Sequence, residues 1–155
     1  MAYQVAVCGP HDCGDVERAH ARRVGELLAA AGAVVLCGGG GGVMAAVAEG
    51  ARSGGGLVVG VRPDDARGDD LSVTVVTNMG QARNAILVWS ADAVIAIGGS
   101  WGTLSEMALA MRRGAVPVVA LGAWRVVDAA GAPVPGIEYV DTAEAAVHSA
   151  LRGRR

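Results

Sequence analysis

The sequence predicts a single Rossmann-like α/β domain over residues 1–155, with a mostly parallel sheet and helices on both of its faces. Three observations lead to this prediction. Short apolar runs alternate with runs of helical periodicity along the whole chain. The strand-like runs are rich in Val and Ala, as expected for strands buried on both faces. A chain of 155 residues can form one core but is too short for two ordinary domains.

Each expected element follows from a local pattern. Six short apolar runs are predicted strands: 3–8, 33–37, 57–61, 72–77, 93–97 and 117–121. Five segments with apolar residues at helical spacing are predicted helices: 15–31, 43–53, 80–90, 103–113 and 142–151. A polar loop with four Asp and two Arg spans 62–70, and 124–135 is expected to form a short hairpin. In a sheet of this kind ligands bind at the carboxyl ends of the strands, which is where the glycine clusters fall.

Charge and hydropathy exclude several classes of protein. The net charge of −2 argues against a nucleic-acid partner. No apolar run reaches membrane-spanning length, and no signal peptide is recognisable at the N-terminus. Three cysteines, an odd number, are typical of a reducing compartment, so we expect a cytoplasmic protein with no membrane partner. The apolar fraction of 52% predicts that a second subunit covers part of the surface, as in a homodimer or higher homo-oligomer.

The composition of the basic residues excludes two further kinds of site. All 13 are Arg, and the chain contains no Lys. A Schiff base to pyridoxal phosphate and the lysine of a Walker-type phosphate loop are therefore excluded. A phosphate would have to be held by backbone amides and arginine, and we expect no resident cofactor.

The first glycine cluster, 38–42, lies between a predicted strand and a predicted helix. A tight strand–helix turn needs one or two glycines, whereas five in a row favour close approach of a ligand to the backbone. The residues expected to contact a phosphate or ribose here are Gly39, Gly40, Gly41, Gly42 and Met44. Segment 40–45 also matches GxGxxA, but it follows the second strand rather than the first, and Arg62 occupies the tip of the next strand, so it is weak evidence for NAD.

The second glycine cluster, 98–102, occupies another strand-to-helix turn. The expected anion-binding residues at this turn are Gly98, Gly99, Ser100, Trp101, Gly102 and Thr103. Glu106, four residues after Gly102, allows two interpretations. Its spacing from Thr103 is that of a capping box, and spacing alone favours this structural role. A carboxylate on the first turn of a helix that follows a glycine cradle is also placed to face a ligand.

Arg83 lies on an apolar helix face, with Met79, Ile86 and Leu87 as its helical neighbours. A buried arginine needs a partner, which here is a structural carboxylate, a ligand phosphate or Glu106. We favour the ligand site, because this helix starts at the carboxyl end of the fourth predicted strand.

Three cysteines and a histidine raise the question of a metal site: Cys8, His11, Cys13 and Cys37. All four can meet at the carboxyl edge of the sheet. Their spacing is not that of a zinc ribbon, and buried cysteine is ordinarily a small apolar residue. We therefore predict no metal.

Together, segments 38–51, 79–87 and 98–106 resemble the LOG ("lonely guy") family and its relatives, which include bacterial proteins labelled lysine decarboxylase and molybdenum cofactor carrier proteins. The resemblance covers nearly the whole chain. It implies a Rossmann-like homodimer that hydrolyses the N-glycosidic bond of cytokinin nucleoside 5′-monophosphates to free base and ribose 5-phosphate. The family signature, PGGxGTxxE with an Arg-Lys pair on the preceding helix, is matched at Arg83, Gly99, Gly102, Thr103 and Glu106.

By this resemblance Arg83 and Glu106 are the catalytic pair, and the turn 98–103 is the phosphate site. Gly98, Ser100 and Asn84 replace the family's Pro, Gly and Lys, which makes the sequence more similar to the carrier-type relatives. The leading hypothesis is a phosphoribohydrolase acting on a purine nucleoside 5′-monophosphate. The alternative is a nucleotide or molybdenum cofactor carrier without chemistry. A lysine decarboxylase is excluded, because no lysine can hold its cofactor.

Overall fold

The computed structural model describes residues 1–154, which form a seven-stranded sheet in the order β4-β3-β2-β1-β5-β6-β7. All six strand pairings are parallel, so the prediction of a parallel Rossmann-like sheet is confirmed. The strands are β1 (Gln4–Cys8), β2 (Val34–Cys37), β3 (Val58–Arg62), β4 (Val73–Val76), β5 (Ala93–Ile97), β6 (Val118–Leu121) and β7 (Ile137–Val140).

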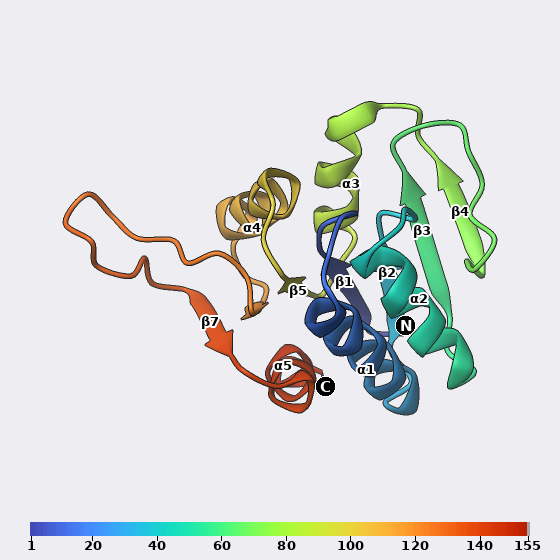
Figure 1. Ribbon diagram of the computed structural model, residues 1–155, viewed down its shortest axis with the longest axis horizontal. Coiled ribbons are helices and arrows are strands. Elements are labelled where there is room, and N and C mark those ends of the chain that lie inside the picture. Colours follow the sequence, from blue (N-terminus) through green and yellow to red (C-terminus); the bar gives the residue numbers. More distant parts are fainter. Residues whose placement is uncertain (155) are drawn as a thin grey trace.

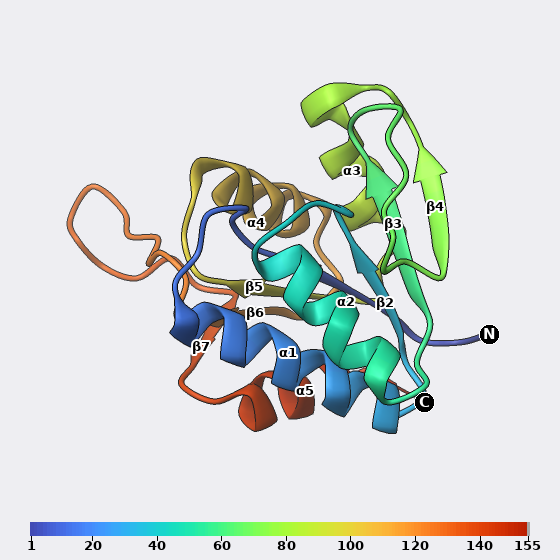
Figure 2. The same cartoon turned by 45° about the vertical axis from the view of Figure 1, so that its right-hand side comes forward.

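Helices cover both faces of the sheet. They are α1 (Asp15–Ala30), α2 (Val43–Ser53), the 3-10 turn η1 (Gly80–Ala82), α3 (Arg83–Trp89), α4 (Trp101–Arg113) and α5 (Ala143–Leu151). Figures 1 and 2 show α1, α2 and α5 together on one face and α3 and α4 on the other. Apolar clusters fill these interfaces: a large one around Val24, Leu28 and Val47 on the first face, and two smaller ones, around Leu87 and Val88 and around Met107, on the other. Within residues 1–154, no helix is both long and apolar enough to cross a membrane.

The strand β7 was not expected from the sequence. It pairs with β6 at the edge of the sheet, its residues are only partly buried, and Glu138 interrupts its apolar pattern. An edge strand of this kind lacks the continuous apolar run that marks the central strands. The predicted hairpin in 124–135 is present, because Val127 bridges Pro133 in antiparallel fashion, and Figure 1 shows this segment projecting from the body of the domain.

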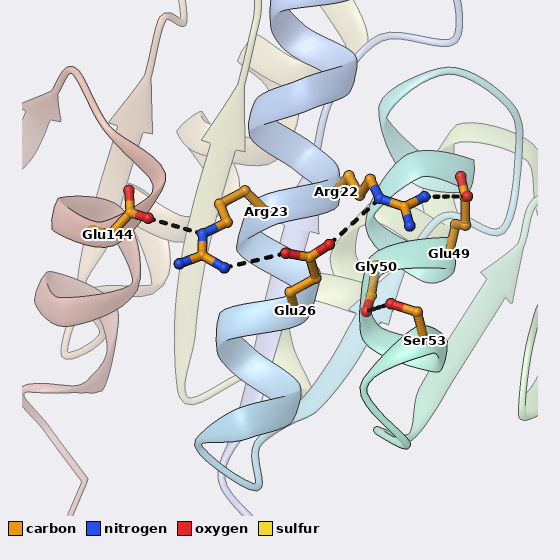
Figure 3. A network of polar contacts seen from close by, with 7 residues as sticks. All are labelled: Arg22, Arg23, Glu26, Glu49, Gly50, Ser53 and Glu144. Carbon is orange, nitrogen blue, oxygen red and sulfur yellow. Dashed lines mark hydrogen bonds and ion pairs between the residues drawn. The ribbon is translucent and has the colours of Figure 1, made fainter.

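A surface network of ion pairs connects α1 with the two helices beside it (Figure 3). Arg23 on α1 donates from Nε to Glu144 of α5 at 2.8 Å and pairs with Glu26 at 3.2 Å. Arg22 pairs with Glu26 at 3.4 Å and with Glu49 of α2. Because the arginines are about half exposed, each pair contributes little to stability, and the buried apolar faces hold these helices together.

The order of the strands determines where a ligand can bind. The chain moves outward from β1 through β2, β3 and β4 and then returns to the other side of β1 as β5. The carboxyl ends of β1 and β5 therefore flank the topological switch point, where doubly wound sheets bind their ligands. The loop after β1 carries His11, and the turn after β5 is the second glycine cluster.

Candidate functional site

A cleft with two compartments lies at this carboxyl edge. The larger compartment, about 400 Å³, is lined by the first glycine turn together with side chains from three other segments: His11, Gly38, Gly39, Gly40, Gly41, Met44, Arg62, Pro63, Asp64 and Arg83. The smaller compartment, about 140 Å³, is lined by the second glycine turn and the starts of α3 and α4: Gly9, Pro10, His11, Met44, Gln81, Arg83, Asn84, Ser100, Gly102, Thr103 and Glu106. His11, Met44 and Arg83 border both compartments, so the two adjoin.

The structure corrects the expectation that Thr103 and Glu106 form a capping box. Helix α4 starts at Trp101, two residues earlier than predicted, and its N-cap is Ser100, whose Oγ accepts the Thr103 amide at 3.1 Å. Glu106 is consequently one full turn inside the helix, where it cannot bond back to the cap amide. Its side chain is 7% exposed and lines the smaller compartment.

The environment of Glu106 changes its acidity. Burial raises the pKa of this carboxyl to about 7, because the charged form loses its hydration. The positive charge of Arg83 and a hydrogen bond from the Cys8 thiol act in the opposite direction, but burial is the larger effect. Glu106 therefore exchanges a proton near neutral pH, which is the property required of an acid or base in catalysis.

Arg83 reaches the same cleft from the first residue of α3. Its Nη1 donates to the carbonyl oxygen of Val61 at 2.8 Å, which ties the start of α3 to the end of β3. The guanidinium lies against Gly38, and a methyl group at that position would collide with it. This explains why the first residue of the glycine cluster is glycine: it gives Arg83 room to enter the cleft.

Two buried polar atoms at the cleft remain unpaired. Among residues 1–154, the only buried side-chain nitrogen or oxygen atoms without a hydrogen-bond partner are Arg83 Nε and Asn84 Oδ1. Asn84 is 3% exposed, and its Nδ2 donates to Ser105 Oγ at 3.1 Å and to Gln81 Oε1 at 3.3 Å. Because Ser105 donates its own proton to the Gly102 carbonyl, it must accept from Nδ2, which fixes the orientation of the amide. Unpaired buried groups are costly and mark sites where a ligand or water completes the bonding.

The first glycine turn is shaped mainly by contacts within the protein. His11 Nδ1 accepts the amide of Gly41 at 3.2 Å, and a Cβ at Gly41 would lie 2.7 Å from the imidazole ring. Arg62 donates to the Gly39 carbonyl while its Nε and Nη2 bind Asp64 at 2.9 and 2.8 Å. The Gly41 amide and the Gly39 carbonyl are thus bonded inside the protein.

Gly102 differs from these glycines. It lies in the first turn of α4, and a Cβ there would have Ser100 Oγ, at 3.8 Å, as its nearest neighbour. The fold could therefore accept alanine at this position, which is the better helix former by about 1 kcal/mol. The absence of a side chain at Gly102 leaves the helix amides open to the smaller compartment, which it lines.

Gly42, Gly98 and Gly99, three further residues of the predicted set, have other protein atoms where a Cβ would lie. The carbonyls of Pro10 and His11 lie against Gly42, and the Trp124 indole lies against Gly99. Gly98 faces the side chains of Pro10 and Glu17. These contacts explain why glycine is needed at the three positions, and their contact with a ligand stays a prediction.

Trp101, the remaining member of the predicted set, is 78% exposed and lines the groove between α3 and α4 beside the cleft. Its ring meets Trp124 edge-on, with centroids 5.1 Å apart. The pair presents an aromatic surface next to the smaller compartment.

Cys8 and Cys37 lie on opposite faces of the sheet. Cys8 packs in the apolar cluster beneath α3 and α4, whereas Cys37 packs in the cluster on the opposite face. Burial raises the pKa of the Cys8 thiol well above its usual value and that of Cys37 to about 11. Across residues 1–154, no group of three or more His, Cys, Asp or Glu side chains is arranged to hold a metal ion.

Sequence reasoning did not assign His11, Gln81 and Asn84 to the ligand site. His11 was considered only as a metal ligand, although its place directly after β1 at the switch point is a signal for the cleft. Gln81 and Asn84 flank Arg83 in the sequence, but only the turn from η1 into α3 places them beside it on the cleft wall.

Comparisons with known proteins agree with this architecture. The model of the SLOG cluster4 family matches residues 2–147. An uncharacterized protein of Archaeoglobus fulgidus is 47% identical over 113 residues, which are 72% of this chain and 75% of the relative.

Solved structures give the same result. The molybdenum cofactor binding protein of Rippkaea orientalis has a TM-score of 0.84 and 30% identity, over 96% of this chain and 94% of that one. The molybdenum cofactor carrier protein of Chlamydomonas reinhardtii has a TM-score of 0.82 and 28% identity, over 96% and 95%. DNA processing protein A of Helicobacter pylori, at 17% identity and a TM-score of 0.73, shares the fold alone. The resemblance predicted from the three motifs is confirmed, and the chain belongs to the SLOG cluster4 family.

Proposed function

We propose that the cleft binds a phosphorylated small molecule with a planar ring system, of the nucleotide or molybdenum cofactor class, and that the protein acts as its carrier. The observation that carries this proposal is Gly102, a glycine inside a helix that no packing contact requires. Ser100 accepts the Thr103 and Leu104 amides, whereas the Trp101 and Gly102 amides lack partners within the helix and belong to the end of α4 that borders the smaller compartment.

The other walls of the cleft support the same ligand class. Arg83 supplies a positive charge beside the α4 N-terminus, as a phosphate requires. The larger compartment has the volume of a small-molecule site. Trp101 offers an exposed ring on which a purine or pterin can stack.

Two observations favour a carrier. Two similar solved structures are named as molybdenum cofactor binding and carrier proteins, and the likeness covers nearly the full length of the chains. In addition, Asn84 stands where the hydrolases of the resembled family have lysine, so this cleft has one cation fewer.

Binding can be tested by titrating the purified protein with AMP in a calorimeter, and by mixing it with isolated molybdenum cofactor before gel filtration. We expect pterin absorbance to co-elute with the protein and Arg83→Met to abolish co-elution. Elution of all pterin absorbance in the small-molecule fraction, with no heat from AMP, would contradict the carrier proposal.

A second candidate function is hydrolysis of a nucleoside 5′-monophosphate, and the observation that favours it is Glu106. A carboxyl with a pKa of about 7 that lines the phosphate pocket can orient water or stabilise an oxocarbenium-like sugar. The test is incubation with AMP and N6-isopentenyl-AMP, followed by assay of free base and ribose 5-phosphate. Release that is lost in Glu106→Gln would establish hydrolysis, whereas binding without release from either nucleotide would leave the carrier function.

We further propose a cytoplasmic homodimer, which would cover exposed apolar side chains. Strand β4 exposes three valine side chains, Val73, Val75 and Val76, and α3 exposes Ile86 and Trp89. The three free cysteines fit a reducing compartment. Sedimentation equilibrium tests the assembly: a mass of two chains is expected, and a single-chain mass at micromolar concentration would contradict it.

A further inference from the structure

We propose that His11 binds the phosphate of the ligand, donating from Nε2 a hydrogen bond in place of the Gly41 amide, which is itself bonded to the His11 ring. This inference rests on the proposed binding of a phosphorylated ligand. It assigns a function to a residue outside the glycine and Arg–Glu motifs.

The hydrogen bond to Gly41 determines which nitrogen of the His11 imidazole carries the proton. The Gly41 amide can only donate, so Nδ1, which accepts it at 3.2 Å, carries no proton. In the neutral ring the proton is then on Nε2. No hydrogen bond within residues 1–154 uses Nε2, which leaves this N–H available to a ligand.

The position of His11 places it beside the other donors of the cleft. His11 lies in the loop after β1, at the switch point, and lines both compartments of the cleft. In the smaller compartment it shares the wall with Arg83 and with Gly102 at the start of α4. A phosphate in this compartment is therefore surrounded by donors from three separate segments. The unpaired Nε of Arg83 is a buried donor in the same wall, and it independently indicates that an acceptor such as a phosphate oxygen completes this site.

A side chain serves as the donor because backbone amides near this turn are already bonded within the protein. In the first turn and at the helix start that follows it, the Gly41 amide bonds to His11 and the Val43 amide to the Pro10 carbonyl. These amides are therefore unavailable to an anion. The imidazole takes the Gly41 hydrogen bond on one nitrogen and offers a new donor on the other. Glycine at position 41 is what allows the ring to lie this close, since a Cβ would be 2.7 Å from it.

Two substitutions test the roles of the two His11 ring nitrogens separately. Asparagine places an acceptor near the position of Nδ1 but has no donor at Nε2, whereas glutamine places a donor near Nε2. We expect His11→Asn to weaken AMP binding by about tenfold or more, the effect of losing one hydrogen bond to a charged group. His11→Gln should retain most of the affinity. Adenosine, which lacks the phosphate, should bind the wild type and His11→Asn equally. The control is His148→Asn, on the exposed surface of α5.

Calorimetry with AMP and adenosine, together with ¹⁵N NMR of the His11 ring during titration with inorganic phosphate, distinguishes the outcomes. Equal AMP affinity in the wild type and His11→Asn would overturn the assignment of His11 while nucleotide binding stands. If AMP does not bind but phosphate shifts the His11 Nε2 resonance, the assignment is supported and the nucleotide is the wrong ligand. If neither AMP nor phosphate perturbs the ring, the assignment of His11 is wrong.

Discussion

Arg83 and Glu106 act on each other through their charges in the cleft. The guanidinium lowers the pKa of the carboxyl, while its Nη1 hydrogen bond goes to the Val61 carbonyl. Burial nevertheless keeps that pKa at about 7. Near neutral pH the pair therefore alternates between an arginine beside a neutral acid and an arginine beside a carboxylate. A phosphate near Arg83 would favour the neutral acid, because two negative charges repel each other.

Removing the charge of Arg83 should change the acidity of Glu106. In Arg83→Met we expect the Glu106 pKa to rise above about 7, because the nearby positive charge no longer stabilises the carboxylate. Carbon-13 NMR of the glutamate carboxyls during a pH titration measures this shift. Arg113→Met is the matched control, since Arg113 also donates to backbone carbonyls, of Val88 and Ala91. An unchanged Glu106 titration in Arg83→Met would show that the two charges do not interact.

Glu106 should also make stability depend on pH. Its folded-state pKa is raised from about 4.5 to about 7, so its contribution to stability is fully present below about 4.5 and is lost as the pH rises through about 7. The loss is at most roughly 3 kcal/mol. Glu106→Gln removes this dependence, and the variant should exceed the wild type in unfolding free energy at pH 8. Urea denaturation from pH 4 to pH 8 measures the difference. If the two proteins differ by a constant amount across this range, the carboxyl is not destabilised by burial.

The cap of α4 should matter for binding as well as for folding. Ser100→Ala removes the acceptor of the Thr103 amide and should cost about 1 kcal/mol of stability. Thr142→Ala removes the equivalent cap of α5 at a similar cost. Because Ser100 lines the smaller compartment, only its loss should weaken AMP binding. Thermal unfolding measures the loss of stability, and calorimetry measures the affinity for AMP. Equal affinity in the two variants would show that the α4 cap is not part of the ligand site.

The central part of the fold was predictable from the sequence, because strands buried on both faces appear as continuous apolar runs. For β7, partial exposure and Glu138 hide that pattern. At the site, the glycine clusters and Arg83 indicated the same edge of the sheet at which the cleft lies. The roles of individual residues were harder to predict from the sequence, because they depend on contacts between segments that are distant along the chain. The lining of the first turn by His11 and the start of α4 at Trp101 are two such cases.

The measurement that tests ligand binding most directly is the affinity of Gly102→Ala for AMP or the molybdenum cofactor, with its melting temperature taken alongside. The account predicts a melting temperature equal to or above that of the wild type, because Ala is the better helix former and its Cβ would meet only Ser100 Oγ, at 3.8 Å. It also predicts a loss of affinity of about tenfold or more, because the methyl group blocks the approach to the α4 amides. Unchanged affinity for the ligand that the wild type binds would contradict a phosphate site at this helix.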